Sequence, residues 1–552
     1  MEKSIIKKPI KRFYQLLKVE RQDIFTIYLY AALAGILSLS LPLGIQAIFN
    51  FLGAGQASTS WIMLIIVVLL ALLGVGITQV MQLKVSENLQ QKIFTRSSFE
   101  FAYRIPHIHL GSITRRYLPE LMNRFFDTIS VQKGLSKILI DFSTASLQIF
   151  FGLILLSIYH PFFIFLSAIL VAGLLFVLRY TFNEGMKTSL LESTHKYEVV
   201  HWLEELARTM QVFKLAGNSK LPLEKADDKV VNYLTARKSH FTVLLRQYYF
   251  LISFKVIITA ALLIIGGLLV FNEQMNIGQF VAAEIIIILV LNAVEKLMLS
   301  METIYDVLTA VEKLGTVADI PLDPSGEIIE VEDDAFSVAM SNVSLSYPDD
   351  PLPTLNNVNL ELEAGSKLLI SGKDELGKTA LLHLLSGMHD TYSGTLLYNE
   401  HNFFKWDKNQ LREYIGDNLI KNGFFNGTIF ENLTLGRAGI DEEDVKTMCK
   451  YFNVFDFIQK QNKDFDSQVL PEGRNIPKYI LLKFKLIRSL LGNPKLILLD
   501  EDVDQLSMSD KEKLISFLQN HKATVVLSSN DETLKSQFKN KALVELGQVT
   551  GY

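Results

Sequence analysis

The sequence Lys367-Leu-Leu-Ile-Ser-Gly-Lys-Asp-Glu-Leu-Gly-Lys-Thr379 decides the fold of the second half of the chain. It begins as an apolar strand, continues as Gly-x-x-x-x-Gly-Lys-Thr, and leads into a helix-forming run at 380–385. In such a loop, backbone N–H groups and the start of the next helix point at nucleotide phosphates. We therefore predict a nucleotide-binding loop with Gly372 and Gly377, in which Lys378 reaches the phosphates and Thr379 ligates Mg²⁺.

The composition of the chain places further bounds on its class. At 552 residues the chain is too long for one core, and its first three hundred residues are far more apolar than the rest. The net charge of −4 and the scattered basic residues do not suggest nucleic-acid binding. The single cysteine, Cys449, cannot form an internal disulfide and is expected to be a buried thiol. No cleavage-site pattern follows the first apolar run, so this run should remain a membrane helix.

Six apolar stretches are long enough to cross a hydrocarbon core of about 30 Å, which needs about 20 helical residues. They lie at 24–51, 61–80, 139–159, 162–180, 249–271 and 277–294. His160-Pro161 should form a tight hairpin between the third and fourth stretches, because proline interrupts a helix. We predict an all-α six-helix transmembrane domain at 1–311, a linker at 312–335, and an α/β nucleotide-binding domain of the P-loop NTPase class at 336–552.

Loop charges predict the orientation in the membrane. The short connections at 53–60, 160–161 and 272–276 carry no Lys or Arg, whereas the N-terminus and the long connections at 82–138 and 181–247 carry many. The N-terminus, the long connections and the nucleotide-binding domain should therefore face the cytoplasm, in a multi-pass protein of the cell's inner (plasma) membrane. Aromatic residues near the span ends are interpreted as interfacial anchors: Tyr28, Tyr30, Trp61, Tyr159 and Tyr180.

Glu284 lies about seven residues inside the sixth apolar stretch, where an ionised carboxylate facing lipid is costly. It is expected to face the interior of the helix bundle. Two interpretations remain open: a residue that lines a substrate path, or a carboxylate that snorkels or hydrogen-bonds between helices.

A second apolar strand, at 495–501, ends in two carboxylates. A buried parallel strand delivers such residues to the edge of the sheet where phosphates bind. Asp500 is therefore predicted to hold Mg²⁺, directly or through water, and Glu501 to orient or deprotonate the attacking water. Further strands are expected at 342–347 and 358–362.

With these features, nearly the whole chain resembles the ATP-binding cassette (ABC) exporters, and the membrane half is most similar to the type I secretion and bacteriocin exporter branch. Ser346-Tyr347 resembles the stretch whose aromatic residue stacks on adenine. The segment 411–432 resembles the one that ends in Gly-Thr-Ile-x-Glu-Asn, and 487–495 resembles the helix before the acidic strand. The resemblance implies ATP and Mg²⁺ as cofactors, with Tyr347 in the ATP site.

The resemblance also implies partners. A second ABC subunit, identical or different, would complete a dimer in the lipid bilayer, and a periplasmic adaptor and an outer-membrane channel would serve a type I secretion-like system. Residues 120–127 and 212–218 stand where such proteins carry coupling helices. No peptidase domain precedes the first span, so leader-peptide cleavage is not expected.

Several family positions are altered in this chain. Glu375, beside Asp374, replaces a glycine of the phosphate loop, and Ile476-Pro-Lys-Tyr-Ile480 replaces the Leu-Ser-Gly-Gly-Gln signature. Ile420 replaces a glutamine, Ser507 an aspartate, and Asn530 the histidine that holds the γ-phosphate. If the Glu375 carboxylate points inward, it repels phosphate and weakens ATP binding, whereas pointing outward it costs little. Since asparagine donates a hydrogen bond but carries no charge, we also expect slow hydrolysis, with Glu501 and Asn530 as the catalytic pair.

Two functions follow from these observations. The first is a dimeric ATP-dependent exporter subunit with impaired or slow hydrolysis, which the retained Lys378, Thr379, Asp500 and Glu501 favour. The second is a non-hydrolysing scaffold or regulatory subunit paired with an active partner, which the altered positions favour. Six spans exclude a soluble P-loop enzyme. The cargo is not distinguished, although the type I secretion likeness favours a polypeptide.

Overall fold

The computed structural model describes residues 2–53, 59–113, 117–347, 352–373, 375–421 and 423–551. The tip of the predicted connection at 53–60 and Asp374 lie outside these residues. The chain forms two compact units, one of Met1–His107 and Arg116–Ile320, the other of Ile108–Arg115 and Pro321–Tyr552. The second unit thus includes a short segment from between two helices of the first. His109 holds this segment, because its backbone N–H donates to Pro321 at 3.0 Å and its Nε2 lies 2.6 Å from Asp390.

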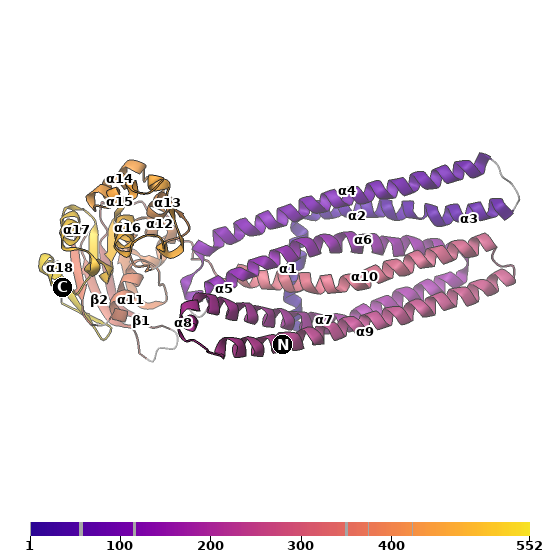
Figure 1. The fold of residues 1–552 in the computed structure, drawn as a ribbon, viewed down its shortest axis with the longest axis horizontal. Coiled ribbons are helices and arrows are strands. Elements are labelled where there is room, and N and C mark those ends of the chain that lie inside the picture. Colours follow the sequence, from indigo (N-terminus) through magenta and orange to yellow (C-terminus); the bar gives the residue numbers. More distant parts are fainter. Residues whose placement is uncertain are drawn as a thin grey trace. The chain divides into compact units, whose positions relative to one another are not determined.

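The first unit is helical in all its described elements (Figure 1). They are α1 Glu2–Val19, α2 Arg21–Ser38, α3 Ser40–Gly53, α4 Thr59–Arg104, α5 Leu118–Met122, α6 Asp127–Tyr159, α7 Pro161–Arg208, α8 Met210–Leu215, α9 Leu221–Phe271 and α10 Ile277–Ala318, with short 3-10 turns between them. Six segments among the described residues are long and apolar enough to cross a membrane. The predicted six-helix membrane domain is therefore confirmed.

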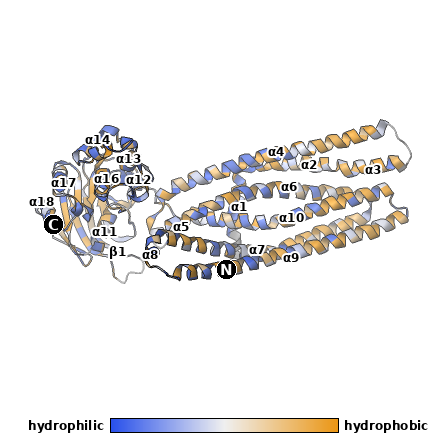
Figure 2. Cartoon of the chain, viewed as in Figure 1, coloured by the Kyte–Doolittle hydropathy of each residue, from blue (hydrophilic) through white to orange (hydrophobic). Residues whose placement is uncertain are grey.

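Hydropathy divides each long helix into two parts. Figure 2 shows apolar residues toward the α3 end of the unit, and a mixture of polar and apolar residues toward α5 and α8. The four longest helices contain 42 to 51 residues, about twice what a bilayer core requires. The helices therefore continue well beyond the apolar layer.

Local sequence explains where several of these helices begin and end. The first span is broken at Leu39 into α2 and α3, and Pro42, which lacks an N–H group, lies one turn later. The predicted hairpin is confirmed at His160, which has extended backbone angles and whose ring accepts a hydrogen bond from Phe162 N at 3.2 Å. Asn276 and Gln279 form a reciprocal capping box that starts α10.

Helix α1 was not expected from the sequence. Its Arg12 donates to the Glu312 carboxylate at 2.7 Å and also pairs with Asp319, both on α10. Gly315 permits this approach, because a Cβ at that position would lie 2.1 Å from the Arg12 guanidinium. Helix α10 itself runs to Ala318, so the first part of the segment interpreted as a linker is helical. The proline that stops helix formation comes only at Pro321.

The second unit contains the predicted α/β fold. A six-stranded sheet has the order β12 Gln548–Thr550, β11 Asn540–Glu545, β3 Lys367–Ser371, β10 Thr524–Ser528, β9 Leu496–Leu499 and β6 Ile415–Asp417. All neighbouring pairs are parallel except β11 with β12. A second sheet has the order β2 Leu355–Leu362, β1 Val338–Leu345, β4 Tyr392–Tyr398 and β5 His401–Asn402, and β7 Gly427–Thr428 pairs with β8 Gln468–Val469.

The helices of this unit pack around the sheets (Figure 1). They are α11 Glu375–Leu385, α12 Lys408–Glu413, α13 Ile429–Thr434, α14 Glu442–Tyr451, α15 Phe455–Gln459, α16 Lys478–Leu490, α17 Met508–Asn520 and α18 Glu532–Gln537. Gly387, at φ +70°, has the left-handed conformation of a residue that follows a helix end.

Strand β3 lies between two hydrophobic cores. Leu368 and Ile370 face one core and Leu369 the other, as the two-residue period of a strand requires. Cys449 belongs to the second of these cores, so the expected buried thiol is confirmed, and burial raises its pKa to about 12. Because both faces of β3 are covered, the position of its carboxyl end, and so of Gly372, is fixed by the two cores.

Candidate functional site

Three neighbouring parallel strands end at one edge of the six-stranded sheet. β10 pairs in parallel with β3 on one side and with β9 on the other. The residues that follow these strands are therefore delivered to the same place: Gly372 after β3, Asp500 and Glu501 after β9, and Asn530 after β10. Ligands of such sheets bind at this edge.

The loop after β3 depends on a glycine at its first position. Gly372 has a φ of +138°, and a Cβ there would lie 2.1 Å from the Val544 carbonyl oxygen. Gly377 and Lys378 are buried in the first turn of α11, and Thr379 follows half-buried. The loop thus leads directly into a helix N-terminus, the arrangement that binds phosphate.

Lys378 is held inside the loop by two oxygen acceptors. Its ammonium group donates to the Gly372 carbonyl and lies 3.0 Å from Glu501 Oε1, while the side chain is only 1% exposed. A buried ammonium needs such compensation, because an unpaired charge in the interior is costly. Lys378 therefore lies where phosphate oxygens can replace Glu501 as its partner.

Asn530 joins the two ends of this site. Its side-chain oxygen accepts from Gly372 N at 3.2 Å, and its Nδ2 donates to Gly372 O at 3.2 Å and to Glu501 Oε1 at 2.9 Å. The neutral side-chain amide of Asn530 thus binds the N–H and C=O groups of Gly372 and also the carboxylate of Glu501, the candidate base. The structure brings Gly372, Lys378, Glu501 and Asn530 into one hydrogen-bonded network.

Sequence reasoning missed the residues that support this network. Asp504 accepts from Ser529 Oγ at 2.5 Å and from Asn530 N at 3.1 Å, which fixes the turn that presents Asn530. Asn418, after β6, accepts from Asp500 N at 2.7 Å. Asn418 and Ser529 are buried polar residues at strand ends, but no spacing in the sequence connects them to the site.

The donors available for a metal ion fit Mg²⁺. Asp500 is buried, and one of its carboxylate oxygens accepts from Glu501 N at 2.8 Å. Within the described part of the chain, no group of three or more His, Cys, Asp or Glu side chains could form an all-protein metal cage. Mg²⁺ is bound by one or two protein oxygens together with water and phosphate, so Asp500 and the Thr379 hydroxyl are a suitable pair.

Tyr347, the candidate adenine-stacking residue, has a partner that was not anticipated. Its hydroxyl lies 3.1 Å from His389 Nε2, and the two rings meet edge to face with centroids 5.3 Å apart. Burial lowers the pKa of His389, with a smaller contribution from neighbouring His383, so the neutral ring is favoured. His389 therefore fixes the orientation of the Tyr347 ring.

Glu375 does not strain the backbone of the phosphate loop. It is the first residue of α11, its side chain is exposed, and it is not among the described residues with positive φ. The altered position thus demands no glycine-like conformation. Of the two side-chain orientations considered for Glu375, the structure has the outward one, in which solvent screens the carboxylate.

The altered signature segment presents a different surface. Ile476 and Ile480 are buried, while Pro477 precedes the first turn of α16, and Lys478 and Tyr479 are exposed. Tyr479 is 61% exposed, at the position that the resemblance aligns with a glycine of the signature. Ser507 has a local role, since its hydroxyl donates to Asp510 at 2.5 Å and caps α17.

The membrane helices contain charged residues that the sequence analysis overlooked. Lys255, inside the predicted span at 249–271, pairs with Glu295, and Asp141 lies 2.9 Å from Lys296. These pairs join α9 and α6 to α10 and neutralise their charges. Glu284 is half-buried and makes no hydrogen bond or ion pair with the described residues.

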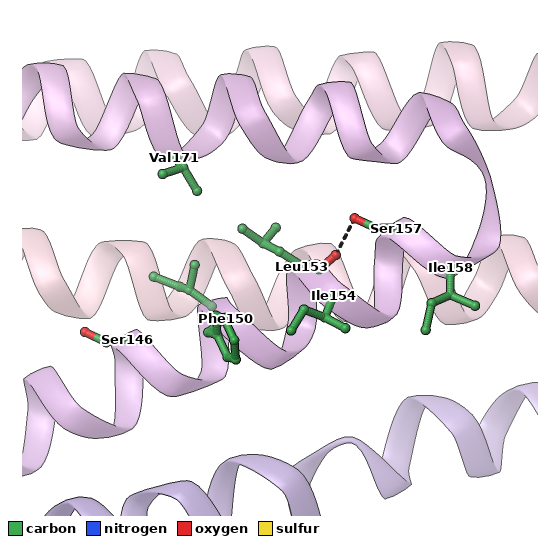
Figure 3. Close-up of a pocket in the computed structure, with 8 residues that line it drawn as sticks. Ser146, Phe150, Leu153, Ile154, Ser157, Ile158 and Val171 are labelled. Carbon is green, nitrogen blue, oxygen red and sulfur yellow. Dashed lines mark hydrogen bonds between the residues drawn. The ribbon is translucent and has the colours of Figure 1, made fainter.

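A cavity of about 530 Å³ lies against the membrane-spanning part of α6 (Figure 3). Its wall is made by α6 and by Val171 of α7, and apart from two serines it is apolar. Ser157 donates its hydroxyl to Leu153 O at 2.7 Å and is thus satisfied within its own helix. This wall offers apolar contact but little that would orient a polar ligand.

Comparisons with known proteins agree with both halves of the chain. The family model of the ABC transporter transmembrane region matches residues 24–294, and that of the ABC transporter matches residues 355–503. The leukotoxin translocation ATP-binding protein LktB of Mannheimia glucosida and that of Bibersteinia trehalosi are each 27% identical over 255 residues. That match covers 46% of this chain but only 36% of the length of these relatives.

The fold of the whole chain also has a solved counterpart. The structure of a bacterial Atm1-family ABC exporter with ATP bound superposes with a TM-score of 0.85 and covers 97% of this chain and 95% of its own. The sequence identity is 17%, so this likeness describes the fold.

Proposed function

Because this chain belongs to the ABC transporter family and carries the membrane and nucleotide-binding domains in one polypeptide, we propose that it is an ATP-dependent exporter subunit that works as a dimer and hydrolyses ATP slowly. The observation that carries this proposal is the convergence of Gly372, Lys378 and Glu501 at one sheet edge. These residues are the parts that phosphoryl transfer requires: a phosphate cradle, a cation and a base.

The proposed mechanism begins with an exchange of partners at Lys378. Phosphate oxygens take the place of Glu501 next to the ammonium group, which frees the Glu501 carboxylate to orient or deprotonate a water molecule. Asp500 and Thr379 would hold Mg²⁺, which would supply neutralisation of the phosphate charge. The loop N–H groups before α11 complete the cradle.

Slow hydrolysis follows from the chemistry of the altered positions. Asn530 donates only neutral hydrogen bonds, and its Nδ2 is already shared between Gly372 O and Glu501 Oε1. Losing one transition-state donor commonly costs about 10² to 10³ in rate. The replaced signature removes a second donor from the opposing subunit, although such losses need not add.

The second candidate function is a scaffold or regulatory subunit whose partner performs the hydrolysis. The exposed Pro477, Lys478 and Tyr479 favour it, since this surface would face the second nucleotide in a dimer. A proline contributes no N–H and a tyrosine prevents close backbone approach. In such a pair, this chain would contribute Lys378 and Glu501 to one of the two composite sites.

The orientation in the membrane, the coupling segments, the cargo and the partners are proposed from the loop charges and from the relatives. The N-terminus and the nucleotide-binding domain face the cytoplasm, with residues 120–127 and 212–218 as coupling segments. The name of the LktB relatives describes leukotoxin translocation, so a polypeptide cargo is proposed here. A periplasmic adaptor and an outer-membrane channel would then continue the path.

The deciding experiment is the ATP hydrolysis rate of the full chain in lipid nanodiscs, compared with Glu501→Gln. We expect a low rate in the unmodified protein and a further fall of at least 10²-fold in the variant, because Glu501 is the base. Glu512→Gln, which neutralises an exposed carboxylate on α17, should leave the rate unchanged. Equal rates for the unmodified chain and Glu501→Gln would favour the scaffold function.

Asn530→His is expected to raise the hydrolysis rate about 10-fold or more, because histidine adds a donor that can carry charge toward the γ-phosphate. Asn520→His, at an exposed position of α17, is the matched control and should have no effect. If Asn530→His leaves the rate unchanged while ATP still binds, the altered signature rather than Asn530 limits turnover.

A further inference from the structure

A second cavity, separate from the nucleotide site, lies among α6, α7, α9 and α10 of the first unit. Its volume is about 250 Å³, and charged and hydroxyl side chains line it. The charged groups are Asp127, Glu192, Lys196, Arg237 and Asp306, accompanied by four hydroxyls and one alanine. No sequence motif pointed to this cavity.

All four helices reach the cavity at the same level. On each helix, one charged residue of the cavity lies twelve positions beyond the cytoplasm-facing end of an apolar stretch, as predicted from the loop charges. These residues are Asp127, Glu192, Arg237 and Asp306, counted from Leu139, Tyr180, Tyr249 and Val294 in that order. Twelve helical residues span about 18 Å. The cavity therefore lies in the polar part of the bundle, outside the hydrocarbon layer.

Four of the five charged groups are already paired with one another. Asp127 accepts from the Tyr197 hydroxyl at 2.6 Å and lies 3.6 Å from Lys196 Nζ. Glu192 accepts from Arg237 at 3.1 Å, and Arg237 also lies 3.6 Å from Glu302. These pairs neutralise both cations that line the cavity.

Two polar groups at the cavity lack such partners. Asp306 is accessible and makes no hydrogen bond or ion pair with any described residue. Ser193 is 8% exposed, and its hydroxyl also has no hydrogen bond to the described residues. Neighbouring Ser189, by contrast, is bonded to Thr309 at 2.8 Å. The Ser193 hydroxyl lines the cavity, so a ligand group at this place would give it a hydrogen-bond partner.

We propose that this cavity binds the guanidinium or ammonium group of a small cationic ligand, with Asp306 as the pairing carboxylate and Ser193 as an additional acceptor. A carboxylate only accepts hydrogen bonds, and a cation supplies the donors and the charge that Asp306 lacks. An anion would meet Asp306 without a free cation to offset it.

The size of the cavity limits the ligand further. At about 30 Å³ per water molecule, the volume of about 250 Å³ corresponds to about eight waters. It lies just below the range of pockets that enclose drug-sized molecules, about 300 to 1,000 Å³. A small amine, or one lysine or arginine side chain of a peptide, is of suitable size. None of the residues that line this cavity belongs to the nucleotide site, so the proposal is tested separately from ATP turnover.

The test is calorimetric titration of the full chain in nanodiscs, without nucleotide, using n-butylguanidine and n-butylurea as probes. The two probes are alike in size and shape, but only the first is charged. We expect n-butylguanidine to bind and n-butylurea to bind at least 10-fold more weakly. Equal binding of the two probes, or no binding of n-butylguanidine, would overturn the proposal.

Variants then locate the site. Asp306→Asn should weaken n-butylguanidine binding at least 10-fold, Asp306→Glu should retain most of it, and Ser193→Ala should weaken it several-fold. Asp228→Asn, an exposed carboxylate on α9, is the matched control and should bind as the unmodified chain does. Unchanged affinity in Asp306→Asn would place the probe elsewhere. If Asp306→Asn fails to fold, the retained binding expected of Asp306→Glu and the probe comparison still decide the question.

Discussion

Replacing Lys378 with alanine is expected to weaken ATP binding by at least 10²-fold. In the structure the ammonium group has two oxygen partners, Gly372 O and Glu501, and is 1% exposed. Hydrogen bonds to charged groups contribute about 1.5 to 3 kcal/mol each, so losing two such bonds to phosphate corresponds to about two to four powers of ten. The measurement is equilibrium binding of a fluorescent ATP analogue to the full chain with Mg²⁺ present.

The same loop supplies a matched control. Lys373 carries the same charge, but it is exposed and makes no hydrogen bond or ion pair with the described residues. Lys373→Ala should change affinity by no more than a few-fold, since exposed charges are screened by salt. If Lys378→Ala and Lys373→Ala weaken binding equally, the loss of affinity comes from the loss of one positive charge near the site. The proposed contact of Lys378 with phosphate is then wrong.

Trp406→Ala is expected to destabilise the nucleotide-binding domain by about 3 to 5 kcal/mol, the usual cost of deleting a buried tryptophan. Its ring is fully buried and meets Phe336 edge to face at 5.6 Å. The backbone of Gly326 also packs against this residue, since a Cβ there would lie 2.1 Å from the Trp406 carbonyl oxygen. The change therefore opens a cavity where the segment before β1 joins the domain.

Hydrogen exchange of the β1 and β4 amides in the full chain measures this effect, because core strands exchange through global opening of the domain. Phe404→Ala is the control, two residues away and 52% exposed, where the ring contacts with Tyr392 and Phe403 and the approach of Lys408 are lost but no buried cavity opens. It should lower the opening free energy by about 1 kcal/mol. A loss below about 2 kcal/mol in Trp406→Ala would mean that the surrounding structure collapses to fill the cavity.

The sequence alone determined the features that arise from local pattern. The six apolar stretches and the phosphate-loop strand could be recognised because a membrane core and a buried strand each demand a run of apolar residues of set length. The His160 break followed from proline chemistry, and the α/β class of the second half followed from its strand and loop signals. Such patterns depend on neighbours within a few residues.

The tertiary structure decided how distant residues meet. Asn530 and Gly372 are 158 positions apart, and Arg12 and Glu312 are 300 apart, so no spacing could have shown that the first pair shares two hydrogen bonds or that the second joins α1 to α10. The outward side chain of Glu375 and the unpaired Asp306 likewise depend on what packs around them. Contact across such separations is set by helix packing and strand order. The sequence could therefore identify candidate site residues, but only the folded chain could show which of them touch.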